Sequence, residues 1–112
     1  MSGHFQVIYS PAAKDDLRGI YAYIAFELKA RQTASNQVNR IRKEIRALDR
    51  MPERYPLVDW EPWLSMEMRK VSVGNYVVFY QVDKETQIVT VIRIFYGRRD
   101  IESIVTADAE TD

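Results

Sequence analysis

The stretch FQVIYSPAAKDDLRGIYAYIAFEL, residues 5–28, places a short alternating apolar segment directly before a long segment with helical periodicity. Alternation over residues 5–9 is typical of a strand, and the Ser-Pro pair that follows ends it. Ser10 is a good helix N-cap, and Pro11 is tolerated at the first helical position. The stretch therefore predicts a short strand that leads at once into a helix.

The helix predicted after Ser10 has one apolar face. Asp15 and Asp16 are expected near its first turn, where the helix dipole favours negative charge. The apolar residues follow one another at intervals of four, three, four and four: Ala13, Leu17, Ile20, Ile24 and Leu28. These intervals match the helical repeat, so all of these side chains are expected on one buried face.

A second amphipathic helix is predicted after a polar break at residues 29–33. Its N-cap is expected at Thr33 or Ser35, and it ends before Pro52. Its apolar residues are Ala34, Val38, Ile41, Ile45 and Leu48. Because the connection is short, we expect an antiparallel helical hairpin whose shared apolar face is covered by the rest of the chain.

The C-terminal half is predicted to provide that cover. Residues 52–63, PERYPLVDWEPW, hold three of the four prolines and both tryptophans without any period, so an ordered loop is predicted there. Segments rich in valine, isoleucine and aromatic residues then predict strands over 64–71, 76–82 and 88–96. A tight turn is expected at Gly74 and Asn75, and a longer one at residues 83–87.

The last two predicted strands are apolar on nearly both faces, which indicates central positions in a sheet. A short helix is expected over residues 99–105, and the acidic residues 106–112 are expected to form a mobile tail. The predicted fold class is α+β, in the order β-α-α-β-β-β, with the helical hairpin on one face of a mainly antiparallel sheet. The opposite face is expected to be open, and residues 1–105 are expected to form a single domain.

Composition limits the function classes. The chain has 16 basic and 16 acidic residues, so its formal charge is zero and any nucleic acid would have to be attracted locally. The absence of cysteine excludes thiolate nucleophiles and cysteine-bound metals, and the single His4 cannot form a histidine-based metal site. No apolar run approaches the ~20 residues of a membrane span. We expect a cytoplasmic protein with no metal, no organic cofactor and no membrane contact.

Several phrases occur in a characteristic order: YSPAAKDDLRGIYAYI (9–24), MPERYP (51–56), NYVVFYQVD (75–83) and IFYGRRD (94–100). Together with the predicted elements, they make the chain resemble the RelE/ParE superfamily of bacterial type II toxins over nearly its whole length, roughly residues 5–105. The resemblance implies one of two activities on a shared fold. RelE-like toxins cut messenger RNA on the ribosome, whereas ParE-like toxins inhibit DNA gyrase and are not known as nucleases.

The RelE catalytic positions favour the ParE-like branch. Aligned on Arg69, the positions of two RelE lysines, one arginine and a terminal tyrosine hold other residues here: Ser65, Glu67, Val77 and, near the chain end, Val105. Arg99 alone matches, and it cannot accept a proton because an arginine pKa exceeds about 12. The resemblance therefore implies a toxin without catalytic residues. The alternative is a nuclease that uses Glu67, Arg69 and Arg99.

Contact with the target is expected from basic and aromatic residues on the strands and after the last one: Arg69, Tyr96, Arg98 and Arg99. Other readings stay open. The adjacent arginines can be a solvated strand end that Asp100 and Glu102 neutralise. Arg69 can form an internal salt bridge with Glu67, which would share its face of a strand.

The resemblance also implies a co-expressed antitoxin whose C-terminal segment wraps the toxin, as a helix in a groove and as an added strand. Its expected contacts are aromatic residues of the proline-rich loop and basic residues of the second helix: Tyr55, Trp60, Trp63, Arg42 and Arg46. Alternatively, the aromatic residues cover the core and the basic ridge is simply solvated. The resemblance implies either a toxin dimer or a toxin-antitoxin heterotetramer.

Overall fold

The computed structural model describes residues 4–97, 101 and 105. The elements follow in the order β1 (Gln6–Tyr9), α1 (Pro11–Ala22), η1 (Tyr23–Glu27), α2 (Arg31–Arg46), η2 (Ala47–Asp49), η3 (Pro52–Arg54), β2 (Arg69–Val73), β3 (Tyr76–Asp83) and β4 (Ile88–Tyr96). The η elements are short π or 3-10 turns. No helix of the described residues is long and apolar enough to cross a membrane.

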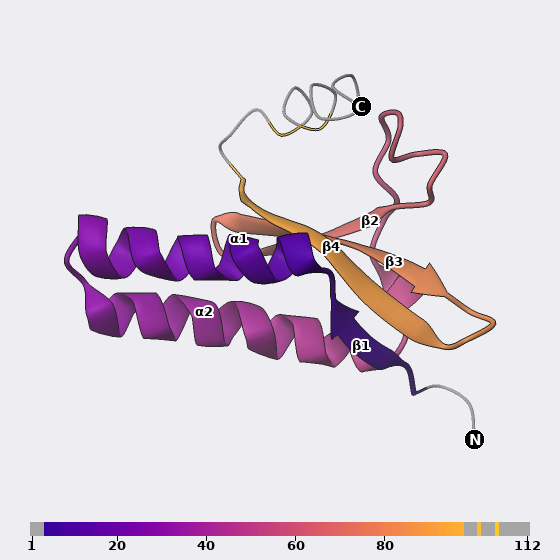
Figure 1. Ribbon diagram of the computed structural model, residues 1–112. Helices are drawn as coiled ribbons and strands as arrows, with labels where there is room; N and C mark the ends of the chain where they lie inside the picture. Colours follow the sequence, from indigo (N-terminus) through magenta and orange to yellow (C-terminus); the bar gives the residue numbers. More distant parts are fainter. Residues whose placement is uncertain (1–3, 98–100, 102–104, 106–112) are drawn as a thin grey trace.

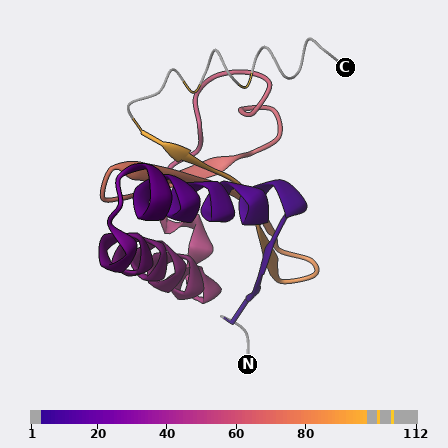
Figure 2. The same ribbon diagram turned by 60° about the vertical axis from the view of Figure 1, so that its left-hand side comes forward.

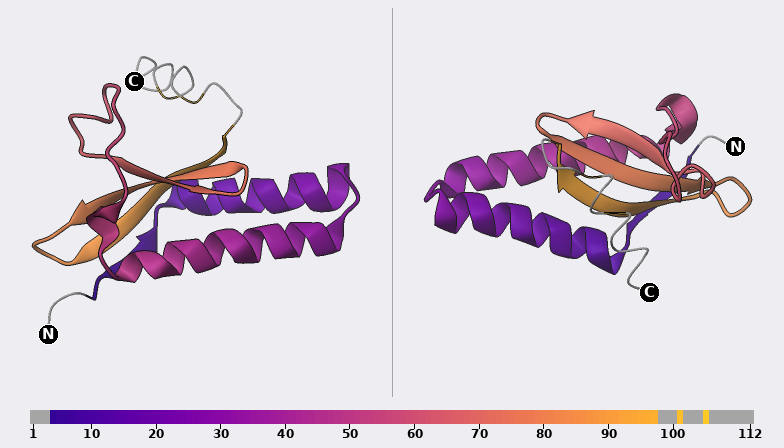
Figure 3. Two further views of the ribbon diagram at one scale, coloured as in Figure 1. Left: turned by 180° about the vertical axis from the view of Figure 1, so that it is seen from behind. Right: turned by 90° about the horizontal axis from the view of Figure 1, so that it is seen from above.

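The strands form one mixed sheet in the order β1-β4-β3-β2. β1 runs parallel to β4, while β3 is antiparallel to both of its neighbours. Helices α1 and α2 form an antiparallel hairpin on one face of this sheet, and the free end of the hairpin extends past the sheet (Figures 1 and 3). The predicted α+β fold is confirmed, and so are the central positions of β3 and β4.

The start of α1 is tied to the sheet by its cap. The Ser10 hydroxyl accepts a hydrogen bond from the Ala13 amide at 3.0 Å and donates one to the Ile92 carbonyl at 2.8 Å. The predicted N-cap is therefore confirmed, and it also positions the helix over β4. Asp15 and Asp16, predicted near the first turn, lie directly after it, because the helix begins at Pro11 and the first turn itself holds no acidic residue.

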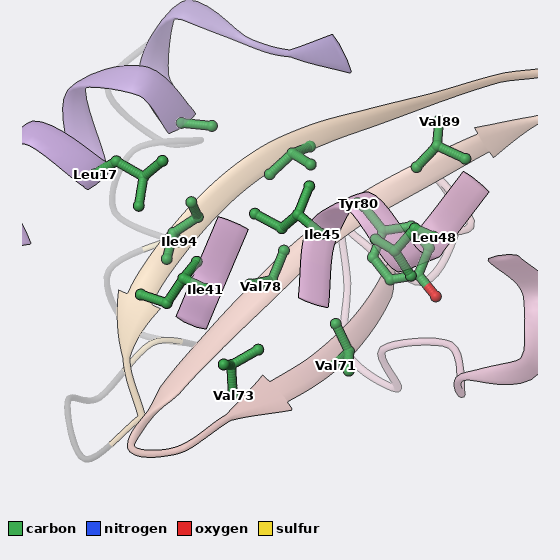
Figure 4. Packing of buried hydrophobic residues seen from close by; sticks show 12 residues of the cluster. Leu17, Ile41, Ile45, Leu48, Val71, Val73, Val78, Tyr80, Val89 and Ile94 are labelled. Carbon is green, nitrogen blue, oxygen red and sulfur yellow. The ribbon is translucent and has the colours of Figure 1, made fainter. Parts of the chain in front are cut away.

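The main core lies between the helical hairpin and the sheet (Figure 4). Its buried residues include half of the apolar positions predicted for the two helices: Ala13, Leu17, Ile41, Ile45 and Leu48. Leu28 was predicted on the same face but is 56% exposed. The reason is the π-helical turn η1, which has a wider repeat than an α-helix and so rotates the residues after it out of phase.

Helix α2 begins earlier than its polar side chains predict. Its N-cap is Ala30, and no side chain caps it, so the predicted caps at Thr33 and Ser35 are wrong. The turn before the helix forms through backbone groups instead: Lys29 adopts a φ of 55°, and the Ala30 amide donates to the Ile24 carbonyl at 3.0 Å. Backbone geometry therefore sets this helix start.

The strand predicted over 64–71 is shorter and begins later, as β2 at Arg69. Residues 64–68 form turns in which the Leu64 amide donates to the Trp60 carbonyl and the Met68 amide to the Trp63 carbonyl. Glu67 has a φ of 55°, which a strand does not allow. The prediction of a strand there is wrong because backbone amides of this segment bond locally within the turns instead of pairing with β3.

The face of the sheet away from the helices is covered, so the prediction of an open face is wrong. The loop between η3 and β2 rises on that side (Figure 2). A second cluster of buried residues lies there: Val58, Trp63, Met68, Phe79, Phe95, Ile101 and Val105. β3 and β4 supply aromatic side chains to this face, and the loop covers them because exposed aromatic surface is unfavourable in water. Both Ile101 and Val105 are helical, while the rest of the helix predicted over 99–105 and the predicted tail lie outside the described residues.

Candidate binding surfaces

Arg69 is held by the chain itself. Its guanidinium donates to the Tyr55 carbonyl at 2.7 Å and to the Glu53 carbonyl at 3.1 Å, and it lies 3.7 Å from the Glu53 carboxylate. The internal salt bridge that the sequence left open is therefore present, but its partner is Glu53 and not Glu67, because Glu67 belongs to a turn and does not share a strand face with Arg69. Arg69 thus fixes the segment before β2, with only 18% of its side chain exposed.

Glu67 and Arg69 nevertheless line one shallow cleft of about 510 Å³. Its charged lining residues are Glu53, Glu67, Asp83, Glu85, Arg69 and Lys84. Both basic groups pair with the Glu53 carboxylate, Lys84 at a distance of 3.2 Å. The cleft therefore has an excess of negative charge, and an RNA phosphate entering it would be repelled.

Tyr80 joins the segment at η3 to the sheet. Its hydroxyl donates to the Pro52 carbonyl at 2.6 Å, and its ring belongs to the main core. Burial raises the pKa of Tyr80 to about 12, although the nearby Arg69 and Arg54 cations act in the opposite direction. The phenol is therefore neutral near pH 7 and serves as a hydrogen-bond donor that ties η3 to β3. Val77, at the position of a RelE arginine, packs against the second cluster.

Tyr96 is partly exposed at the end of β4, where it meets Tyr76 with ring centroids 5.6 Å apart. Together with Tyr23 of η1, both rings line a groove of about 830 Å³ between α1 and the ends of β3 and β4. The sequence predicted Tyr96 as a contact residue but gave no reason to select Tyr23. The predicted contacts Arg98 and Arg99 lie outside the described residues.

The aromatic residues of the loop contact the chain itself. Trp63 is buried, with its ring 4.6 Å from that of Phe79 and stacked on Trp60 at 6.3 Å. Lys70 places its ammonium 5.6 Å from the Trp60 ring. Tyr55 is half-buried against the main core. Both tryptophans thus act as cover for the sheet, and a role for these three residues in antitoxin binding stays a prediction.

The basic residues predicted on the second helix are exposed beside a second groove. Arg42 and Arg46 lie near Tyr9, whose pKa is raised by burial and lowered by these two cations. The groove, of about 520 Å³, runs between α1 and α2 and is lined by Tyr9, Lys14, Leu17, Arg18, Tyr21, Ala22, Phe26, Val38 and Arg42. Sequence reasoning found Arg42 but missed Lys14 and Arg18. Tyr21 and Phe26 could have indicated this groove, because they are aromatic residues outside the apolar face predicted for the first helix.

Metal binding has little basis in the described part of the chain. There, no group of three or more His, Cys, Asp or Glu side chains is arranged to hold a metal ion. The two grooves beside α1 are open, partly apolar and flanked by charged residues, which is typical of surfaces that contact other macromolecules.

The fold is that of the RelE/ParE toxins. A structure of the chromosomal ParDE toxin-antitoxin system of Pseudomonas aeruginosa matches with a TM-score of 0.69 at 17% identity, covering 85% of this chain and 98% of that one. The toxin-antitoxin complex RelBE2 of Mycobacterium tuberculosis matches with a TM-score of 0.59 at 18% identity, over 86% and 94% of the two chains. An archaeal RelE-RelB complex from Pyrococcus horikoshii OT3 matches with a TM-score of 0.60 at 12% identity, over 86% and 98%.

The sequence itself identifies the branch. The family model described as the ParE toxin of the type II toxin-antitoxin system parDE matches residues 7–101. The chain belongs to this family of toxins. No curated protein sequence matches it.

Proposed function

We propose that this toxin arrests growth by binding DNA gyrase, without cutting RNA, and that a cognate antitoxin neutralises it. Its membership of the ParE family supports gyrase as the target. Because gyrase acts on DNA, the proposed place of action is the bacterial cytoplasm. No metal or organic cofactor takes part in the proposal.

The observation that carries the proposal is the state of the residues that a nuclease would use. Glu67 lies in an exposed turn, and the basic groups of its cleft both pair with Glu53. Cleavage through a 2′-hydroxyl needs cations around the charged transition state, and each missing contact of this kind costs about 10²- to 10³-fold in rate. Val77 supplies none. A protein with this surface is better suited to bind a partner protein than to cleave RNA.

For the antitoxin, the groove between α1 and α2 offers a fitting surface. Its floor is apolar, with Leu17 and Val38, and its rim carries Lys14, Arg18 and Arg42. An acidic amphipathic helix would bury its apolar side on this floor and place its carboxylates beside the basic rim. The solved relatives were all described together with an antitoxin or as a toxin-antitoxin system. The proposed assembly is a toxin-antitoxin heterotetramer.

The direct test is DNA supercoiling by purified gyrase in the presence of the toxin. We expect inhibition that rises with toxin concentration and is relieved by the antitoxin. Full gyrase activity at a large molar excess of toxin would refute the proposal. Primer extension on translated message is the companion measurement, in which we expect no new cuts at codons.

A further inference from the structure

The groove beside Tyr23 differs in chemistry from the one proposed for the antitoxin. Its lining residues come from α1, η1, α2 and the ends of β3 and β4. These elements meet where the helical hairpin extends past the sheet (Figures 1 and 3). From α1 it is lined by Asp15, Asp16, Gly19 and Ile20, whereas the groove proposed for the antitoxin is lined by other α1 residues, such as Lys14 and Arg18. Helix α1 therefore borders both grooves.

The walls of this groove are aromatic and apolar. Tyr23 and Leu28 are each 56% exposed, and Tyr96 is 37% exposed. Tyr76 and Tyr96 meet with ring centroids 5.6 Å apart, and both line the groove together with Tyr23. Burial raises the pKa of Tyr76, and the phenols of Tyr96 and Tyr23 raise it further. Partly exposed aromatic groups that gather in one groove are typical of a surface that binds another protein.

The described residues that line the groove include two carboxylates, Asp15 and Asp16, and one guanidinium, Arg93. Asp16 is already bound, because it accepts from the Arg93 guanidinium and from the Ile94 amide, each at 2.8 Å. Arg93 is the only basic side chain among the described residues that line the groove. Asp15 is the remaining charged residue of the lining, and it forms an exposed ion pair at 2.7 Å with Arg18, which lines the other groove. Such an exposed ion pair contributes little to stability, so a cation of a bound partner can replace Arg18 beside Asp15 at small cost.

We propose that this groove is the target-binding surface of the toxin and that it takes a protein segment with an arginine or lysine flanked by apolar side chains. The inference rests on the proposed function, since it describes the partner of that same toxin. A cation fits between the electron-rich faces of the tyrosines and the Asp15 carboxylate. The flanking apolar side chains fit against Leu28 and Ile20. The two grooves thus select partners of opposite charge.

Gly19 provides a variant that separates this role from folding. An added Cβ at Gly19 meets no atom within 4 Å, because the position faces the groove. Gly19→Leu replaces a poor helix former by a good one, so the fold is expected to become slightly more stable while the leucine fills the groove. A purely structural role for this surface would leave binding unchanged or improved in such a variant.

The first test measures binding of two labelled amphipathic peptides, one built of leucine and arginine and one of leucine and glutamate, to the full chain by fluorescence anisotropy. Gly19→Leu, Tyr23→Ala and Asp15→Lys are each expected to weaken the leucine-arginine peptide roughly 10-fold or more. The matched controls Phe26→Ala and Asp59→Lys change exposed residues outside the groove and are expected to have no effect. Unchanged affinity in the three groove variants, or no binding of the leucine-arginine peptide at all, would overturn the inference.

The second test measures growth arrest and antitoxin binding with the same variants. Gly19→Leu is expected to lose growth arrest and to keep antitoxin binding, whereas Arg42→Glu is expected to do the reverse. The inference is wrong if Gly19→Leu arrests growth like the wild type, or if it loses the antitoxin instead. A dimer of the wild-type chain that Asp15→Lys dissociates would show a second copy in the groove and also overturn it. If the wild type itself arrests no growth, the proposed function fails, and the peptide measurement still decides the chemistry of the groove.

Discussion

The two faces of the sheet are covered in different ways. On one face, side chains of α1 and α2 repeat at helical spacing and pack against β3 and β4. On the other face, an irregular loop between η3 and β2 brings Trp63 and Met68 onto Phe79 and Phe95. Both faces exclude water, although only the first has a repeating sequence pattern. Regular periodicity therefore identifies only part of a core, and an irregular aromatic loop can complete it.

The sharpest test of this comparison is Trp63→Ala. Trp63 is 7% exposed, so its truncation leaves a cavity on the loop face and is expected to lower the free energy of unfolding by about 4 kcal/mol. Urea denaturation followed by circular dichroism gives this value. Leu64→Ala is the control, because Leu64 is 41% exposed and its loss is expected to cost less than about 1 kcal/mol. A Trp63→Ala cost as small as that of the control would mean that this face is open after all.

A smaller effect is expected from Tyr80→Phe, since Tyr80 belongs to the helix face and bonds to the start of the irregular segment. Burial raises the pKa of Tyr80 from 10.0 to about 12, so the folded state holds the phenol proton more tightly than the unfolded chain does. The resulting stabilisation is full below about pH 10 and is lost as the pH rises through about 12. A pKa shift of about two units corresponds to a loss of about 2–3 kcal/mol in the free energy of unfolding as the pH rises through this range.

Urea denaturation of both proteins between about pH 9 and 12 measures this contribution. In Tyr80→Phe, the part of the alkaline loss due to Tyr80 is expected to vanish, and the stability at neutral pH is expected to fall by about 1 kcal/mol. Parallel curves for the two proteins over that pH range would contradict the role given to Tyr80.

Ser10→Ala tests how the helix face is joined to the sheet. The substitution removes the N-cap bond to Ala13 and the bond to the Ile92 carbonyl, and a loss of about 1 kcal/mol is expected. Ser35→Ala is the matched control, because Ser35 lies inside α2 and caps nothing. Thermal unfolding of the two variants is the measurement. If Ser35→Ala were the more damaging change, the helix start at Arg31 would be wrong.

The smallest expected effect is a gain in stability. The Gln37 side-chain amide nitrogen is buried and has no hydrogen-bond acceptor among the described residues. Gln37→Met replaces an unsatisfied donor by an apolar group of similar length, so a gain of up to about 1 kcal/mol is expected. Gln32→Met is the control, because the exposed Gln32 amide already donates to Asn36. A loss of stability in Gln37→Met would indicate that this donor has a partner.

Local patterns predicted much of the fold. Ser10 identified the start of α1, the spacing of residues such as Ile41 and Ile45 identified the hairpin, and the apolar β3 and β4 were rightly placed at the centre of the sheet. These features depend on neighbours a few residues away. Leu28 and residues 64–68 were predicted wrongly because a π turn and a series of backbone bonds override the side-chain pattern.

The candidate surfaces were only partly predictable. Arg42 and Tyr96 were selected from the sequence, and both line a groove. The sequence could not show that Arg69 is held by carbonyls of the segment before β2, because that contact joins parts of the chain that only the fold brings together. For the same reason, it did not show that Asp15 and Lys14, neighbours in α1, face different grooves.

Growth arrest by Glu67→Ala is the most direct measure of whether the toxin acts by binding gyrase or by cleaving RNA. Glu67 is exposed, so its truncation is not expected to disturb the fold. When the variant is induced without antitoxin, we predict arrest equal to that of the wild type, because gyrase binding does not need a general base. Loss of arrest in Glu67→Ala, with the protein folded and bound by its antitoxin, would contradict this account.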